Sequence, residues 1–204
     1  MDANYTFAIP VGMRKFAKII LISMKIGKWK ILDSKYIIKR PWLTARVDTV
    51  ELPNGVVHPE YYVLEYPTWI NVIAITTESK FVMVEQYRHG LADVFTELVA
   101  GVVEKDEEPL HAAQRELLEE TGYGNGDWQQ FMVLSANPGT NTNLTYTFLA
   151  TGAEKLSGQN LDETEDIAIK LLSENEVKAM LLNDEIKQSL MAAPLWKYMA
   201  MGSK

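Results

Sequence analysis

Cysteine is absent from the 204-residue sequence, which excludes disulfide bridges, thiolate metal sites and cysteine nucleophiles. Histidine is scarce, and His58, His89 and His111 are too scattered to indicate a zinc site. Basic residues are in the minority, with 20 Lys and Arg against 27 Asp and Glu and a formal net charge of −7. This balance argues against nonspecific nucleic-acid binding. The lack of cysteine fits a reducing compartment, so we expect a cytoplasmic protein.

Long hydrophobic runs are missing as well. The apolar run at 16–24 is interrupted by Lys18, and it is far shorter than the ~20 residues that a membrane-spanning helix needs. The N-terminal segment also lacks the features of a cleavable signal peptide. Two interpretations of residues 1–23 stay open: a loosely held extension ahead of the folded domain, or a basic amphipathic helix that touches a membrane surface. We favour the extension and expect no membrane partner.

The rest of the chain, 24–204, is rich in segments of β-branched and aromatic residues, and no low-complexity linker divides it. Its length suits one domain with a sizeable core. The pattern predicts the α/β (α+β) class, with a mixed sheet between helices in an α/β/α sandwich and N-terminal antiparallel strands at 24–66. The strands are expected at 35–39, 45–52, 60–66, 70–77, 80–88, 95–99, 128–134, 144–150 and 165–172.

Local signals mark the turns and helix ends. Pro53-Asn54-Gly55 predicts an antiparallel hairpin between the strands at 45–52 and 60–66. Ser173 and Glu176 form a capping-box pattern that opens a helix reaching about residue 182. A last helix is expected from about residue 189, with Pro194 near its first turn.

One segment carries an unfavourable arrangement of charges. Pro109 suits the first turn of a helix and Gly122 the left-handed position just past its end, so a helix is predicted over 109–121. Glu116, Glu119 and Glu120 then lie on one face, where they repel one another, and two of them lie near the helix C-terminus, where the helix dipole disfavours negative charge. A solvated acidic face is the ordinary interpretation. The flanking sequence favours a functional one.

Carboxylates clustered without His or Cys favour a hard cation, Mg²⁺ or possibly Mn²⁺, over zinc. Such ions are usually shared with substrate phosphates, so a phosphate-bearing substrate is expected. Bound cations would also relieve the repulsion among the glutamates. Arg115 is expected to act structurally, because a guanidinium can fix glutamate side chains through paired hydrogen bonds.

The segment resembles the Nudix box: Gly101, Glu107 and the run from Arg115 to Tyr123 (RELLEETGY) fit its fixed positions. Further segments of the chain, between about 35 and 200, are similar to the ADP-ribose pyrophosphatase branch of the Nudix hydrolases. The segments that carry this similarity are EQYR at 85–88, ELVAG at 97–101, Pro138-Gly139 and LDETE at 161–165. The resemblance implies that the protein hydrolyses the diphosphate bond of a nucleoside diphosphate derivative, with ADP-ribose giving AMP and ribose 5-phosphate.

The resemblance also implies roles for individual residues. Glu116, Glu119 and Glu120 are expected to bind the metal together with the Ala100 carbonyl, and Gly101, Glu107, Arg115 and Gly122 to maintain the shape of the box. Glu120 is counted among the catalytic residues. The general base comes from the acidic loop, where Glu163 is the first candidate and Glu165 the second. The loop could alternatively be a solvated turn.

Substrate contacts are expected from Arg88, Glu97, Pro138, Gly139 and Asn143. Arg88 could bind phosphate or simply pair with Glu97. Asn143 stands about where many ADP-ribose hydrolases of this branch carry a glutamate, which leaves the identity of the nucleotide derivative open. The alternatives are other nucleotide sugars, dinucleotides and dinucleoside polyphosphates.

The resemblance further implies a homodimer formed through the N-terminal strands at 24–66, with a catalytic core at 67–204. Trp42 is a candidate for stacking on a nucleobase. From a different class of function, a non-catalytic Nudix-fold module that binds nucleotide sugars is the rival. Such modules typically lose glutamates of the box, and all of them are present here.

Overall fold

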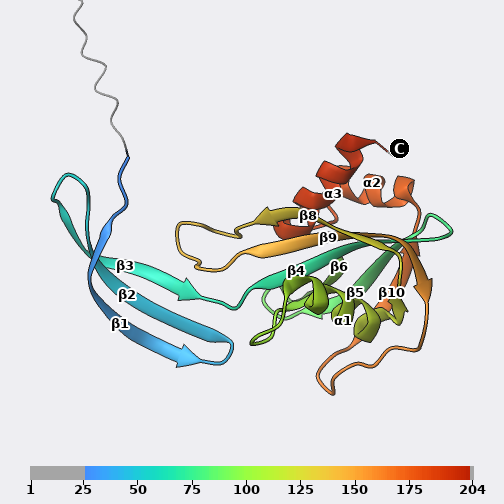
Figure 1. Ribbon diagram of the computed structural model, residues 1–204, viewed down its shortest axis with the longest axis horizontal. Helices are drawn as coiled ribbons and strands as arrows, with labels where there is room; N and C mark the ends of the chain where they lie inside the picture. The colour runs from blue at the N-terminus through green and yellow to red at the C-terminus, as the bar shows by residue number, and fades with distance from the viewer. Residues whose placement is uncertain (1–25, 203–204) are drawn as a thin grey trace, which may run out of the picture.

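The computed structural model describes residues 26–202, so the extension predicted at 1–23 lies outside the described residues. The described strands form two sheets, one of three strands and one of seven. Figure 1 shows the smaller sheet standing to one side of the rest of the molecule. Within residues 26–202, no helix is long and apolar enough to cross a bilayer.

The smaller sheet is antiparallel throughout, in the order β1-β2-β3, and its strands are β1 (Lys30–Arg40), β2 (Leu43–Glu51) and β3 (Val57–Glu65). The predicted hairpin between β2 and β3 is confirmed, and Gly55 in its turn has φ of 82°, a value that favours glycine. Strand β1 begins five residues earlier than the sequence indicated. Its extra residues, Lys30–Ser34, do not alternate between polar and apolar, and they pair with the far end of β2.

The larger sheet carries the core of the molecule. Its strand order is β10-β5-β6-β4-β9-β7, and β8 pairs with β9 outside this path. Strands β4 and β9 run parallel while the other neighbouring strands of this sheet are antiparallel, so the predicted mixed sheet is confirmed. The strands are β4 (Trp69–Thr76), β5 (Phe81–Arg88), β6 (Asp93–Val102), β7 (Tyr123–Gly124), β8 (Asp127–Leu134), β9 (Thr145–Lys155) and β10 (Ile167–Leu172).

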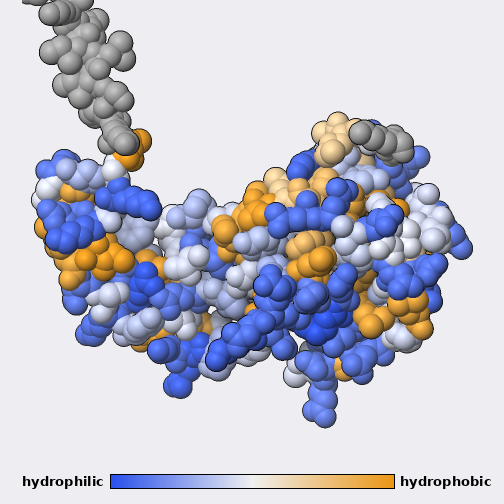
Figure 2. All heavy atoms as spheres, in the orientation of Figure 1, coloured by the Kyte–Doolittle hydropathy of each residue, from blue (hydrophilic) through white to orange (hydrophobic). Residues whose placement is uncertain are grey.

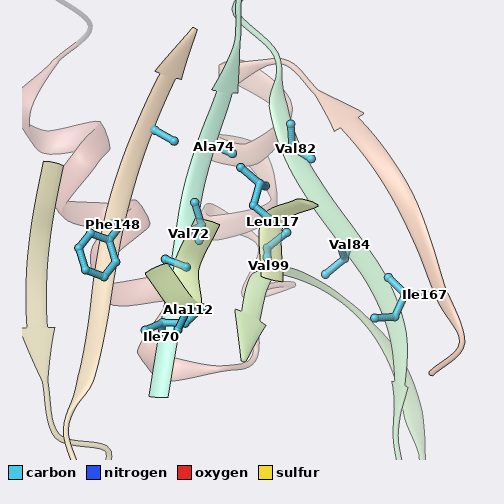
Figure 3. Packing of buried hydrophobic residues seen from close by; sticks show 12 residues of the cluster. Ile70, Val72, Ala74, Val82, Val84, Val99, Ala112, Leu117, Phe148 and Ile167 are labelled. Atoms are coloured by element: carbon cyan, nitrogen blue, oxygen red, sulfur yellow. The ribbon is translucent and has the colours of Figure 1, made fainter. Parts of the chain in front are cut away.

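Helices cover both faces of this sheet, which confirms the sandwich. Alternate residues of β4 and β5 point to opposite faces, as the period of a strand requires. On one face, Val72 and Val84 pack against Leu117 of α1 (Pro109–Thr121), and Figure 3 shows this cluster. On the other face, Ile73 and Met83 pack beneath α2 (Glu174–Leu182) and α3 (Ser189–Met201).

The signals at the helix ends were accurate for α1 and α2. Pro109 is the first residue of α1, and Gly122 ends it with φ of 67° while its N–H donates to the Leu118 carbonyl at 2.7 Å. Both hydrogen bonds of the capping box between Ser173 and Glu176 are present at the start of α2.

The expected position of Pro194 was wrong. Helix α3 begins at Ser189, so Pro194 lies in its second turn, where a residue normally donates its N–H to the carbonyl four positions earlier. That carbonyl belongs to Leu190. Instead, the Asn71 side chain of β4 donates to it at 2.8 Å, and Asn71 is only 1% exposed. A buried amide from the sheet therefore replaces the backbone donor that proline lacks.

We expect Asn71→Ala to lower the free energy of unfolding by about 1–3 kcal/mol, because the Leu190 carbonyl loses its buried partner. In a Pro194→Ala background the restored N–H at position 194 can bond to that carbonyl, so the same substitution should have a smaller effect. Denaturant unfolding of the four proteins of this double-mutant cycle measures the difference. An equal loss in both backgrounds would mean that the amide does not stand in for the missing N–H.

Candidate active site

The predicted glutamates lie where α1 passes over the end of β6. Glu116 approaches Gly101 so closely that a Cβ atom at position 101 would overlap the Glu116 carboxyl group. Position 101 therefore has to be glycine for α1 to bring this carboxylate against the strand. Glu120 is buried at 4% exposure, whereas the Glu119 side chain is 39% exposed. The three carboxylates thus share one face of the helix but differ in their access to water.

Arg115 joins the helix to the strand and loop before it. Its Nε and Nη2 donate to the two oxygens of Glu107, each at 3.1 Å, and Nη2 also donates to the Val102 carbonyl at 3.1 Å. Its Nη1 donates to Glu116 at 2.8 Å and to Glu119 at 3.2 Å. The hydrogen bonds from Arg115 lower the pKa of Glu107. One guanidinium thereby holds three carboxylates in fixed positions.

Glu120 has the most perturbed pKa of these carboxyl groups. Burial raises its pKa to about 8, and the negative charges of Glu116 and Glu165 add to the effect, while a backbone hydrogen bond with Ala100 partly opposes it. Burial likewise raises the pKa of Glu116. The Glu120 Oε2 atom is buried without a hydrogen-bond partner. An unpartnered carboxylate oxygen among other carboxylates fits a divalent cation, which would supply the missing positive charge.

The carboxylates do not by themselves form a complete coordination shell. Within residues 26–202, no group of three or more His, Asp or Glu side chains is arranged so that it could hold a metal ion. Any cation at Glu120 would therefore need further oxygens from the backbone, water or substrate phosphates. This is the usual situation for Mg²⁺, which retains water and binds phosphate oxygens.

A cleft of about 530 Å³ opens in front of these residues. Its lining includes Arg88 from β5, Ala100–Val102 from β6, Glu116 and Glu119 from α1, and Asp162 and Glu165 from the acidic loop. Trp42, in the turn between β1 and β2 and 81% exposed, also lines it. The smaller sheet therefore contributes an aromatic side chain to a cleft whose other walls come from β5, β6, α1 and the segments that adjoin them.

The two candidate bases occupy different positions in the loop. Glu165 lines the cleft, and its Oε2 accepts a hydrogen bond from the Asp162 N–H at 3.0 Å. Its charge also reaches Glu116 and Glu120, whose pKa values it raises. Glu163 is exposed and is not among the residues that line the cleft. In this conformation of the loop, Glu165 faces the helix carboxylates and Glu163 does not.

Gln159, which sequence reasoning missed, fastens the acidic loop to α1. Its Nε2 donates to the Glu120 carbonyl at 2.8 Å and to the Ile167 carbonyl at 2.9 Å, so one amide joins the helix to both ends of the loop. The Asn160 N–H adds a bond to the Glu119 carbonyl at 2.8 Å. These donors satisfy carbonyls at the helix end that have no partner within the helix. No local sequence signal marks Gln159, because its partners lie 39 and eight residues away.

We expect Gln159→Ala to lower kcat about tenfold or more while KM changes little, because the loop acids lose their fixed distance from the helix. Steady-state kinetics with the substrate proposed below, together with the melting temperature, measures this. Gln129→Ala, an exposed glutamine on β8, is the matched control. A loss of thermal stability with unchanged kcat would show that Gln159 is needed for folding only.

Arg88 and Glu97 pair with each other beside the cleft. The Arg88 Nε donates to the Glu97 Oε2 at 3.0 Å, and Gln86 approaches the same oxygen at 3.4 Å. Glu97 is buried at 5% exposure, whereas the Arg88 side chain is 45% exposed and lines the cleft. The ion pair thus leaves part of the guanidinium accessible from the cleft.

The structure does not bring Pro138, Gly139 and Asn143 to the cleft lining. Their loop packs on β3 instead: Tyr61 donates through its hydroxyl to the Gly139 carbonyl, and the Thr140 carbonyl accepts from the Leu64 N–H at 2.8 Å. Asn143 is buried and donates to the Pro67 carbonyl at 2.9 Å. In the single chain, this loop joins the two sheets.

The three histidines are all exposed, and none takes part in a metal cluster within residues 26–202. His58 lies edge-on to Tyr61, and His89 lies beside Tyr87. These contacts are those of surface side chains.

Comparison with known families decides what kind of protein carries this cleft. The NUDIX domain family matches residues 67–193, which is more than half of the chain. The chain belongs to the Nudix family. Residues 29–64 of this Nudix hydrolase also match the nucleoside diphosphate sugar hydrolase N-terminal domain, so the smaller sheet has a family of its own.

Curated relatives place the Nudix hydrolase among ADP-ribose pyrophosphatase-like proteins. It is 34% identical over 164 residues to an ADP-ribose pyrophosphatase of Bacillus subtilis, covering 78% of this chain and 84% of the relative. It is 31% identical to one of Mycobacterium tuberculosis, covering 72% of each chain. It is also 34% identical to a methanol dehydrogenase activator of Bacillus methanolicus, and the match covers 81% of this chain and 89% of the relative.

A solved structure described as an ADP compounds hydrolase has the same fold. Its TM-score is 0.76 at 20% identity, and the match covers 86% of this chain and 95% of the other. Because the match spans both sheets, the arrangement of the smaller sheet beside the Nudix domain is shared.

Proposed function

We propose that this Nudix hydrolase cleaves the diphosphate bond of nucleoside diphosphate derivatives in a metal-dependent reaction, with ADP-ribose as the leading substrate. The observation that carries the proposal is Glu120, buried with an unpartnered oxygen on the helix whose Glu116 and Glu119 line a cleft that also exposes Arg88. An unpartnered carboxylate oxygen and a guanidinium that is partly accessible from the cleft fit a phosphate that arrives with a cation. Two relatives named ADP-ribose pyrophosphatase support the choice of substrate.

Mg²⁺, or Mn²⁺ in its place, would be held by Glu116, Glu119, Glu120 and the Ala100 carbonyl. When bound, it supplies a positive charge that polarises the phosphate oxygens and lowers the pKa of an attacking water. Arg115 supports this set by fixing Glu116 and Glu119 from the side. The chain thereby orients its carboxylates before a cation arrives.

Arg88 binds a phosphate oxygen with the face of its guanidinium that Glu97 leaves free, and Glu97 keeps it aimed at the cleft. Trp42 stacks on the nucleobase at the mouth, because an exposed indole in a polar cleft offers an aromatic surface for a heterocycle. Pro138, Gly139 and Asn143 would act on substrate only indirectly, through the joint between the two sheets.

Glu165 and Glu163 of the acidic loop have different roles. Glu165 faces Glu116 and Glu120, so it would add negative charge that helps to hold the cation. Glu163, two residues away and exposed, accepts the proton of the attacking water when the loop closes over substrate. A carboxylate engaged by a cation is a poor base, which is why the role falls to Glu163.

Purified protein incubated with ADP-ribose and Mg²⁺ should release AMP and ribose 5-phosphate, and the reaction should stop with EDTA. Parallel incubations with other nucleotide sugars and dinucleotides rank the substrates, and ¹⁸O-water identifies the phosphorus attacked. Failure to cleave any nucleoside diphosphate derivative with Mg²⁺ or Mn²⁺ would refute the proposal. Tight binding of ADP-ribose without turnover would favour the non-catalytic binding module instead.

We also propose that the protein is a cytoplasmic homodimer joined through the smaller sheet. A three-stranded sheet needs a covered apolar face to be stable, yet β1 is exposed along its whole length and carries Ile31, Tyr36 and Ile37. Figure 2 shows apolar side chains on the surface of the smaller sheet.

Sedimentation equilibrium should give twice the mass of one chain for the wild type, and Ile37→Lys should reduce the measured mass to that of one chain. A wild-type monomer at micromolar concentration would exclude the dimer.

A further inference from the structure

The loop between β8 and β9, residues 135–144, extends from the larger sheet to the edge of the smaller one, as Figure 1 shows. The Thr140 carbonyl accepts from the Leu64 N–H at 2.8 Å, and the Thr142 N–H donates to the Leu64 carbonyl at 3.1 Å. Asn141 thereby pairs with Leu64 as a parallel strand would. The β8–β9 loop is therefore bound to the smaller sheet while both of its ends belong to the larger one.

Two side chains add to this joint. The Tyr61 hydroxyl of β3 donates to the Gly139 carbonyl. Asn143 is buried, and its Nδ2 donates at 2.9 Å to the carbonyl of Pro67, which lies in the segment that links β3 to β4. The Tyr61 ring lies edge-on to Trp29, with 5.7 Å between the ring centroids. Tyr61 thus packs beside the smaller sheet through its ring and binds the β8–β9 loop through its hydroxyl.

The smaller sheet carries the effect of this joint to Trp42. Ala45 of β2 is the pairing partner of Leu64, the residue that the β8–β9 loop holds. The pairing of β1 with β2 runs to the last residue of β1, so only Pro41 and Trp42 are left for the turn. A two-residue hairpin turn has few allowed conformations. The position of Trp42 therefore follows the position of the smaller sheet.

An ionic network makes the smaller sheet rigid at the same end. Glu65, the last residue of β3, accepts hydrogen bonds from the Tyr36 hydroxyl of β1, at 3.2 and 3.3 Å, and from Arg46 of β2. The Arg46 Nε also donates to Asp48 at 3.0 Å, and Asp48 is buried. Hydrogen bonds between charged groups are among the stronger ones. One carboxylate thus ties the three strands together, so we expect the sheet to move as one body.

We propose that Tyr61 is a positioning residue. Through the Gly139 carbonyl it fixes the angle between the smaller sheet and the larger one, and it thereby holds Trp42 at the cleft. Trp42 lines the cleft but is 81% exposed, so its own contacts do little to keep it there. The part of this proposal that concerns substrate rests on the function proposed above, in which Trp42 stacks on the nucleobase.

Tyr61→Phe removes the hydroxyl and keeps the ring. We expect KM for ADP-ribose to rise about three- to tenfold with kcat unchanged, because a displaced Trp42 weakens binding of substrate and transition state alike. In a Trp42→Ala background the same substitution should leave KM unchanged. Tyr62→Phe is the matched control: Tyr62 is the next residue of β3, is 54% exposed and points to the opposite face of the sheet. It should leave KM unchanged in both backgrounds.

The absence of cysteine from the chain permits a direct measurement of the joint. Spin labels at Asn54→Cys, in the turn between β2 and β3, and at Glu78→Cys, in the turn between β4 and β5, report the distance between the two sheets. Both positions are exposed. An excess of unlabelled protein suppresses distances between chains. Tyr61→Phe should broaden the distance distribution of the ligand-free protein, and Tyr62→Phe should not.

An unchanged distance distribution in Tyr61→Phe would overturn the proposal, whether or not ADP-ribose is cleaved. A rise in KM that is equal in the wild-type and Trp42→Ala backgrounds would also overturn it, because Tyr61 would then act on substrate without Trp42. If ADP-ribose is not cleaved at all, the proposed function fails, and the distance distribution alone decides whether Tyr61 fixes the smaller sheet.

Discussion

Glu120→Gln should lower kcat for ADP-ribose by roughly 10³-fold or more, because several kcal/mol of transition-state stabilisation depends on a cation that this carboxylate helps to hold. The substitution keeps the shape of the side chain and removes only its charge. Steady-state assays across a range of Mg²⁺ concentrations measure the loss. Glu78→Gln, an exposed glutamate in the turn between β4 and β5, should retain full activity.

The same variant separates chemistry from folding through its stability. The folded-state pKa of Glu120 is raised to about 8 by burial, so the folded protein holds a proton that the unfolded chain releases above its ordinary pKa of 4.5. Stability of the metal-free wild type therefore falls as pH rises from about 4.5 to 8. Glu120→Gln lacks this titration. In EDTA it should be the more stable protein at pH 8, with the difference shrinking towards pH 4.

Urea unfolding of both proteins at several pH values tests this directly. A Glu120→Gln protein that is inactive and less stable than the wild type at pH 8 would point to misfolding rather than to loss of a ligand. An active Glu120→Gln protein would remove Glu120 from the metal site altogether.

The second large effect is expected at the acidic loop. Glu163→Gln should lower kcat about 10²–10⁴-fold even at saturating Mg²⁺, because a general base contributes a factor of this size. Glu165→Gln should instead raise the Mg²⁺ concentration needed for half-maximal rate, since its carboxylate faces Glu116 and Glu120. Asp166→Asn, on the same loop and exposed, is the matched control.

Measurement of kcat against Mg²⁺ concentration distinguishes the two roles. If Glu165→Gln is inactive at every Mg²⁺ concentration while Glu163→Gln is nearly as fast as the wild type, then Glu165 is the general base. In that case catalysis needs no closure of the acidic loop beyond the conformation described here.

Sequence reasoning was accurate where a single residue type sets the local backbone. Pro109 and Gly122 predicted both ends of α1, because proline suits the first turn and glycine the left-handed position after the last. The spacing of Glu116, Glu119 and Glu120 likewise placed them on one helix face. The family itself could be read from the same segment.

Sequence reasoning failed where the deciding contact joins distant parts of the chain. Pro194 was expected near the first turn of its helix, and nothing near it in the sequence shows that Asn71 of β4, 119 residues before Leu190, supplies the missing donor. The packing of the Pro138–Asn143 loop on β3 and on the Pro67 carbonyl could not be read from the sequence either, because Tyr61 and Pro67 lie 78 and 76 residues before Gly139 and Asn143. Gln159 was not noticed at all.

The sequence alone thus determined the class of fold and the family, since both follow from local backbone preferences and from residues a few positions apart. Only the tertiary structure decided which carboxylates are buried, which loop acid faces them and where the cleft continues. Burial sets the pKa of Glu120, and burial depends on the packing of α1 against a sheet whose neighbouring strands are remote in sequence. A hollow of about 340 Å³ beside the cleft has the same origin, because β4, β9 and α3 meet there only after folding.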